Sequence, residues 1–357
     1  MPVKDIIDNL SESRLFAESV RFSGDSLKTN RQTQIDSSEI NAFFSLNNLH
    51  VTPLITPIIS KCIENVTRNL RIPSSAVTAY VYSSKDINAS CIAGNDVECI
   101  IQLSSGLIDI LEDNEIESVI GHELGHFLYN HGATSDQADH KSLEFFIQKR
   151  AQEFSADRIG LLSCGDLNAA VRAMMKVVSG LSSRHLNFNV GEFISQLSRT
   201  DNLRMPSNFQ PSHPPMLVRC RALLWFSTCE AFMSGKHDYS TTEIEKIDKK
   251  IQNDIDKYVD PAAVETIKEL KESVKLWLSA SIIIEDNRFD NEEQEQFEKS
   301  FGKAKLEKLK VFISNPNAKM NVAKKLEVSI QNLSQEMPSR IDDEIESIEK
   351  EIRTNFK

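Results

Sequence analysis

The segment Gly121-His122-Glu123-Leu124-Gly125-His126 constrains this chain most, because it places two histidines four residues apart. In an α-helix, residues i and i+4 lie on one face, so a helix would let both imidazoles reach one metal ion. Asp113-Asn114-Glu115 supplies a cap and acidic residues ahead of a helix. The apolar residues that follow in helical spacing are Ile116, Val119, Ile120, Leu124 and Phe127. We therefore predict a helix that carries His122 and His126 as ligands of one zinc ion per chain.

Glu123 lies between the two histidines and is not itself a ligand in this pattern. Its carboxylate can polarise a zinc-bound water and pass the proton to the leaving amine. Short patterns also arise by chance, and the alternative is two surface histidines on an ordinary helix. The predicted helix around the motif favours the zinc interpretation.

A catalytic zinc needs a third protein ligand and one open position. The metzincin pattern would need glycine and histidine at positions 129 and 132, but the chain has Tyr129 and Gly132, and His131 is one residue off register. The next predicted helix, 141–163, carries Glu153 and Asp157 on one face. We predict Glu153 as the third ligand and Asp157 as the acceptor of a ligand histidine's other N–H. The alternative is a solvated acidic face.

These residues resemble the HtpX and CAAX prenyl protease group of gluzincins, peptidase family M48. The resemblance covers about residues 50–233 and implies a small β-sheet beside a helical bundle, with the two motif helices crossing at the metal. Three further stretches resemble family segments. They are Ile87-Asn88-Ala89 before an edge strand, Ser105-Gly106-Leu107 ahead of the motif helix, and Ser212-His213-Pro214-Pro215 followed by Arg219.

His213 and Arg219 each keep two interpretations. His213 can approach the metal, to stabilise the oxyanion or to cap the ion at rest, or it can simply begin a helix before Pro214. Arg219 can bind a substrate carbonyl or pair with Asp157. The long loop 201–213 would then gate the site, with His213 as the moving part.

The fold class that we predict is mainly α with a small β-sheet. Strands are expected at 76–82 and 97–103, the latter as an edge strand for substrate pairing, with a polar loop between them. Further helices are expected at 53–70, 166–179, 190–199 and 214–233. Residues 1–49 are expected to form a helical and irregular extension.

A polar stretch at 234–242 predicts a boundary between a metallopeptidase domain, 50–234, and an all-α bundle, 242–357. Residues 285–293 fail the calcium-loop pattern and favour a polar turn with a capping aspartate, similar to the acidic helix–turn–helix of tellurite-resistance B-like domains. The bundle could bind a partner protein.

The net charge of −11 argues against a nucleic-acid or anionic-membrane binder. We expect no secretory signal and no transmembrane helix, since no apolar run approaches about 18 residues. The six cysteines form no C-x-x-C pair, so we expect reduced thiols and a cytoplasmic location. The predicted function is a zinc metalloendopeptidase acting on proteins or peptides. The alternatives are an exopeptidase and a zinc-stabilised, capped scaffold that binds partners.

Overall fold

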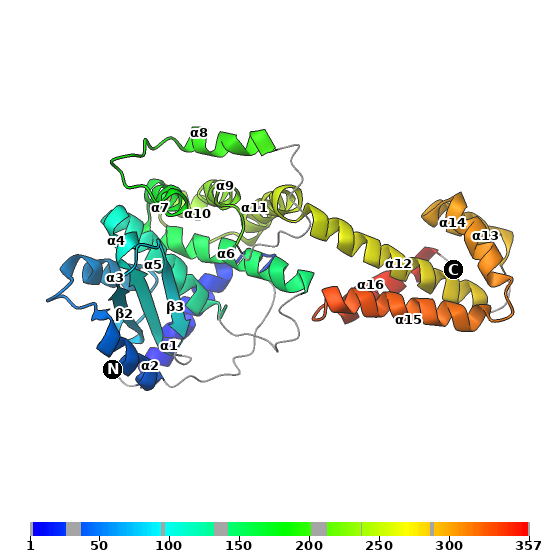
Figure 1. Cartoon of the computed structure of the whole chain (residues 1–357), viewed down its shortest axis with the longest axis horizontal. Coiled ribbons are helices and arrows are strands. Elements are labelled where there is room, and N and C mark those ends of the chain that lie inside the picture. Colours follow the sequence, from blue (N-terminus) through cyan, green and yellow to red (C-terminus); the bar gives the residue numbers. More distant parts are fainter. Residues whose placement is uncertain are drawn as a thin grey trace. The chain divides into compact units, whose positions relative to one another are not determined.

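The computed structural model describes residues 3–25, 37–93, 97–131, 142–200, 213–236, 238–285 and 289–355. The chain forms two compact units. The first contains residues 1–137, 147–204 and 210–259, and the second contains 138–146, 205–209 and 260–357. The described elements are mainly helices with one four-stranded sheet (Figure 1), so the predicted fold class is confirmed.

The sheet lies in the first unit and has the strand order β1-β2-β4-β3. Its strands are β1 Leu49–His50, β2 Val77–Tyr82, β3 Ala89–Ala93 and β4 Cys99–Ser104. Strands β2 and β4 run parallel, with Val77 opposite Cys99, whereas β3 runs antiparallel to β4. The two predicted strands therefore exist and are neighbours in the sheet.

The prediction that residues 97–103 form an edge strand is wrong. Strand β4 pairs with β2 on one side and with β3 on the other, and its apolar residues are buried as expected for a central strand. The edge strand next to β4 is β3, which lies within the segment that we expected from composition to be a polar loop, at the place where the family resemblance implied an edge strand after Ile87-Asn88-Ala89. Strand β3 has only five residues, Ala-Ser-Cys-Ile-Ala. Four of them have small side chains and all are only partly buried, so the sequence gives a weak strand signal.

The helices of the first unit follow the predicted ranges closely after residue 50. They are α3 Pro57–Asn69, α4 Ser105–Ile110, α5 Asp113–Leu128, α6 Leu143–Cys164, α7 Leu167–Ser179, α8 Val190–Ser195, α9 Met216–Phe226, α10 Glu230–Met233 and α11 Thr241–Asp254. The N-terminal part adds α1 Val3–Val20 and α2 Ser37–Asn47. Helix α5 packs on β3 and β4 and also contacts α3 and α7, so it lies at the centre of this unit.

Helices α5 and α6 approach closely because small residues face each other. A Cβ atom on Gly160 would lie 2.8 Å from the Ser118 carbonyl oxygen, and one on Gly125 would lie 3.0 Å from the Ala156 Cα. Larger side chains would push the two backbones apart. The approach brings the face of α5 that carries His122 next to the face of α6 that carries Glu153.

Helix α11 belongs to the first unit, although it lies beyond the predicted boundary at 234–242. Its Asp248 forms a buried ion pair with Arg158 of α6. The same guanidinium donates to the Val20 carbonyl oxygen at 2.9 Å, which also fixes the end of α1. The predicted domain bounds themselves stay a prediction.

The second unit contains α12 Pro261–Glu285, α13 Asn291–Phe301, α14 Lys303–Ile313, α15 Ala318–Glu336 and α16 Ile341–Asn355. Helix α12 packs along α15 and α16. Residues 286–288 of the predicted acidic turn lie outside the described residues, but Asp290 caps α13 by accepting from the Glu293 N–H at 2.9 Å. The likeness to tellurite-resistance B-like domains stays a prediction. Within the described ranges, no helix is long and apolar enough to cross a membrane.

The close contact between α5 and α6 predicts that a single methyl group added at Gly160 lowers stability. We expect Gly160→Ala to lower the free energy of unfolding by about 1–3 kcal/mol, because the added Cβ meets backbone rather than a movable side chain. Gly191→Ala is the matched control, since its Cβ would have ordinary contact with Asn189 Oδ1 at 3.5 Å. Urea unfolding of both variants measures the difference, and equal stabilities would contradict the tight crossing.

Candidate metal centre

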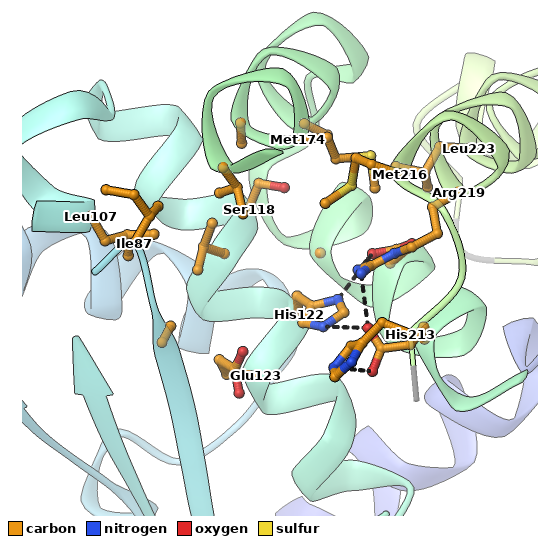
Figure 2. Close-up of a pocket in the computed structure, with 18 of the residues that line it drawn as sticks. Ile87, Leu107, Ser118, His122, Glu123, Met174, His213, Met216, Arg219 and Leu223 are labelled. Carbon is orange, nitrogen blue, oxygen red and sulfur yellow. Dashed lines mark hydrogen bonds and ion pairs between the residues drawn. The ribbon is translucent and has the colours of Figure 1, made fainter. Parts of the chain in front are cut away.

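A cavity of about 180 Å³ opens beside His122 and Glu123 (Figure 2). Asn88 and Ala89, at the start of β3, line one part of it, and Arg219 of α9 lines another. Its apolar lining residues include Leu107, Val119, Met174, Val177, Met216 and Leu223. A second cavity of about 380 Å³ runs along β3 from Ala89 to Ala93 and also borders His122 and Glu123. His122 and Glu123 therefore border both cavities.

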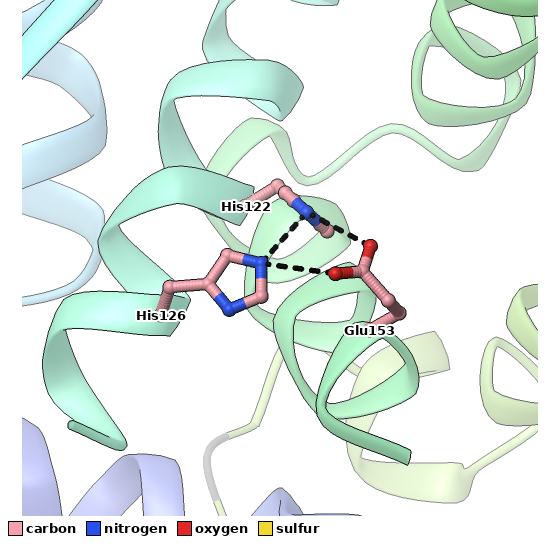
Figure 3. A group of neighbouring side chains, drawn as sticks. All are labelled: His122, His126 and Glu153. Atoms are coloured by element: carbon pink, nitrogen blue, oxygen red, sulfur yellow. Dashed lines mark hydrogen bonds and ion pairs between the residues drawn. The ribbon is translucent and has the colours of Figure 1, made fainter. Parts of the chain in front are cut away.

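His122, His126 and Glu153 form a triangle of donor atoms (Figure 3). The Nε2 atoms of the two histidines lie 3.1 Å apart. The Glu153 carboxylate oxygens lie 3.6 Å from His122 Nε2 and 3.5 Å from His126 Nε2. The structure thus brings the three predicted ligands together from two helices.

The triangle fits a tetrahedral zinc ion. Zinc bonds of about 2.0–2.1 Å at tetrahedral angles separate the donors by about 3.3 Å, close to the three observed distances. Two imidazoles and a carboxylate are also a donor set that zinc accepts in catalytic sites. Three protein donors leave the fourth corner open for water or substrate.

Asp157 and Arg219 support the triangle from behind. Asp157 Oδ1 lies 3.0 Å from His122 Nδ1, the ring nitrogen that faces away from His126. Arg219 donates to both Asp157 oxygens at 2.8 and 2.6 Å, and its Nη1 lies 2.9 Å from Glu153 Oε2. Of the two predicted roles for Arg219, the ion pair with Asp157 is the one present.

Burial and charge shift the pKa values of these groups in different directions. Burial alone would raise the pKa of Asp157, but the charge and hydrogen bonds of Arg219 outweigh it and lower the pKa to about 2. Burial lowers the pKa of His126 well below its usual value, and the neighbouring His122 and His131 add to this. His126 is therefore neutral, which is the form that offers a lone pair to a metal.

The pKa values of His122 and Glu123 are both raised, unlike those of His126 and Asp157. Burial would lower the pKa of His122, yet the hydrogen bond and charge of Asp157 raise it overall. Burial raises the pKa of Glu123, and a backbone hydrogen bond from Cys91 of β3 partly offsets this rise. Glu123 thus lies beside the metal triangle as a carboxylate whose proton affinity is increased, facing the edge strand.

His213 lies at the site but remains largely exposed. Its Nε2 is 3.5 Å from Glu153 Oε1, while 65% of its side chain is accessible to solvent. Pro214 and Pro215 follow it, and α9 begins at Met216. Residues 201–212 of the predicted gating loop lie outside the described residues, so the gating idea stays a prediction. Arg221, two residues beyond Arg219 on α9, pairs with Asp254.

Two residues near the triangle were missed as site residues. His131 Nδ1 lies 2.8 Å from His126 Nδ1, and His131 Nε2 lies 3.0 Å from Asp25 Oδ2. Helix α5 ends at this point because Asn130 adopts a left-handed conformation, with φ of 60°. The backbone N–H of His131 then donates to the backbone carbonyl of His126 at 2.9 Å, which turns His131 back toward the motif. Asn130 was the sequence signal that could have predicted the end of the helix and the turn at His131, whereas no local pattern pointed to Asp25.

Comparison with known proteins agrees with this geometry. The model of peptidase family M48 matches residues 53–148 and 143–225. The metalloprotease YcaL of Escherichia coli K12 is 29% identical over 166 residues, which cover 42% of this chain and 62% of that protein.

A chloroplastic, plastoglobule-localised metallopeptidase 48 of Arabidopsis thaliana is 27% identical over 171 residues, covering 40% of this chain and 50% of that protein. The metalloprotease LoiP of E. coli is 43% identical over 60 residues, or 17% of this chain and 22% of that protein. The chain thus spans less than two thirds of the length of these relatives, and no solved structure gave a significant match. The matched region, residues 53–225, and these relatives support membership of the chain in peptidase family M48.

Proposed function

We propose that this protein is a zinc-dependent metalloendopeptidase that hydrolyses peptide bonds in proteins or peptides. The observation that carries the proposal is the donor triangle of His122, His126 and Glu153 with Glu123 directly beside it. When bound there, zinc would supply Lewis acidity and lower the pKa of the attacking water toward neutrality.

Glu123 is the proposed general base. It borders both cavities and lies next to His122 on α5, so it can take a proton from water and later give it to the leaving amine. Burial raises the pKa of Glu123, which favours both steps because a shuttle must hold the proton between them. A purely structural metal site would not need this carboxylate.

Strand β3 is the proposed docking edge for an extended substrate. Among the described residues it pairs with β4 alone, so its other side can add a strand. The two cavities meet at His122 and Glu123, and Ala89 lines both. Space on both sides of Glu123 lets a peptide extend in both directions, which favours an endopeptidase over an exopeptidase.

His213 is the proposed oxyanion stabiliser, and Asp157 and Arg219 hold the ligands. The alternative is a capped scaffold, and the position of the His213 ring near Glu153 supports that alternative too. We keep a cytoplasmic location and partner binding through the C-terminal helices as proposals. The six cysteines, which are free thiols in the structure, support a reducing compartment.

Replacing Glu123 tests the proposal directly. We expect Glu123→Gln to keep the fold and the zinc but to lower kcat by about a hundredfold or more, because an amide of the same shape cannot accept the proton. Cleavage of casein and of a peptide library measures kcat, and metal analysis measures zinc. Glu117→Gln on the same helix is the control, since Glu117 borders neither cavity. Near-wild-type cleavage by Glu123→Gln would refute the assignment.

Replacing His213 separates catalysis from capping. We expect His213→Ala to lower kcat by about a hundredfold with little change in KM, because a transition-state contact is lost. His185→Ala removes an exposed histidine that lines neither cavity and should leave kcat unchanged. A rise in the basal activity of His213→Ala would instead mean that His213 caps the metal at rest.

A further inference from the structure

The ring of His126 begins a line of contacts that ends on a buried carboxylate. His126 Nδ1 faces His131 Nδ1 at 2.8 Å, and His131 Nε2 faces Asp25 Oδ2 at 3.0 Å. The side chains of His131 and Asp25 are only 5% and 1% exposed. Water therefore does not replace these contacts, and each buried polar atom depends on its neighbour in this line for a hydrogen bond.

With neutral imidazole rings and an ionised Asp25 carboxylate, the three groups leave only one direction for each hydrogen bond. A neutral imidazole carries one N–H, and an ionised carboxylate only accepts. Asp25 therefore requires the N–H of His131 on Nε2, which leaves His131 Nδ1 as an acceptor. That acceptor requires the N–H of His126 on Nδ1, which leaves the lone pair of His126 Nε2 pointing into the donor triangle. The opposite arrangement would place two acceptors 3.0 Å apart at Asp25.

The turn that presents Asp25 is attached to the rest of the unit at several points. The Phe22 N–H donates to Ser155 Oγ at 3.2 Å, and the Ser23 N–H donates to Asp248 Oδ2 at 2.8 Å. Gln148 of α6 donates to the Gly24 carbonyl at 3.2 Å. These bonds fix the backbone directly before Asp25 to α6 and α11, so Asp25 is held in place against His131.

His131 is held with equal firmness. Its ring stacks on Tyr129 at a centroid distance of 5.2 Å, and Lys149 donates to its carbonyl oxygen at 3.1 Å. The Tyr129 hydroxyl in turn donates to the Ala17 carbonyl of α1 at 2.7 Å. Helix α1 and the C-terminal end of α5 are therefore in direct contact next to His131.

We propose that Asp25 is a positioning residue of the metal centre, which acts through His131 to orient His126 and fix its tautomer. Each histidine ligand then has its own supporting carboxylate: Asp157 contacts His122 directly, and Asp25 supports His126 through one intervening ring. Asp25 lies outside the matched region 53–225, so the N-terminal extension completes the site. This inference rests on the proposed metal site.

Zinc affinity of the full-length protein tests the inference. We expect Asp25→Asn to bind Zn²⁺ about 10–100-fold more weakly than the wild type, the usual effect of losing an outer-shell partner. Competition for Zn²⁺ with a chromogenic chelator measures the affinity, and circular dichroism verifies the fold. Asp109→Asn is the matched control, because it makes the same chemical change at an exposed aspartate that lines neither cavity.

The outcomes separate this inference from the proposed function. Failure of the wild type to bind Zn²⁺ would contradict the metal site itself. If the wild type binds, an unchanged affinity of Asp25→Asn, or an equal loss in Asp109→Asn, would overturn only the role of Asp25. Should Asp25→Asn not fold, nuclear magnetic resonance of the histidine ring nitrogens in the wild type decides. A proton on His131 Nε2 supports the inference, and one on His131 Nδ1 overturns it.

Discussion

Gly160 of α6 lies against the Ser118 carbonyl of α5, and the grouping of His122, His126 and Glu153 depends on this close approach. Each helix alone offers two polar side chains on one face, which is common on protein surfaces. Only when the backbones meet do His122 and His126 of one helix face Glu153 of the other at 3.5–3.6 Å. Helix α5 also packs on the sheet, so the same helix places Glu123 beside the edge strand β3. One helix therefore positions both histidines opposite Glu153 and places Glu123 beside the edge strand β3.

Charge balance explains why this arrangement favours a cation. Glu153 and Asp157 are buried carboxylates, and buried charges are costly unless they are paired. Arg219 pairs with both, which leaves one negative charge among the three groups. A divalent cation at the open side of Glu153 would offset that charge. The lowered pKa of His126 acts in the same direction, since a neutral imidazole does not repel the ion.

Local spacing was enough to predict the parts of the site that lie on single helices. The residues of each pair, His122/His126 and Glu153/Asp157, are four positions apart, and the spacing of the apolar residues around them predicted the helices. The composition of the segment did not reveal strand β3 because its five residues, four of them small, give little periodicity, and strand order depends on pairing between distant segments. His131 and Asp25 were missed for a related reason: they are 106 residues apart and meet only in the folded chain. Such contacts leave no pattern in a single sequence.

A crystal structure with anomalous diffraction recorded at the zinc absorption edge tests the central claim most directly. The account predicts one zinc ion per chain, about 2.0–2.1 Å from the Nε2 atoms of His122 and His126 and from a Glu153 oxygen. The anomalous peak should vanish in the His122→Ala/His126→Ala double variant. A zinc ion held by other residues, or a double variant that retains its zinc in full, would contradict the account.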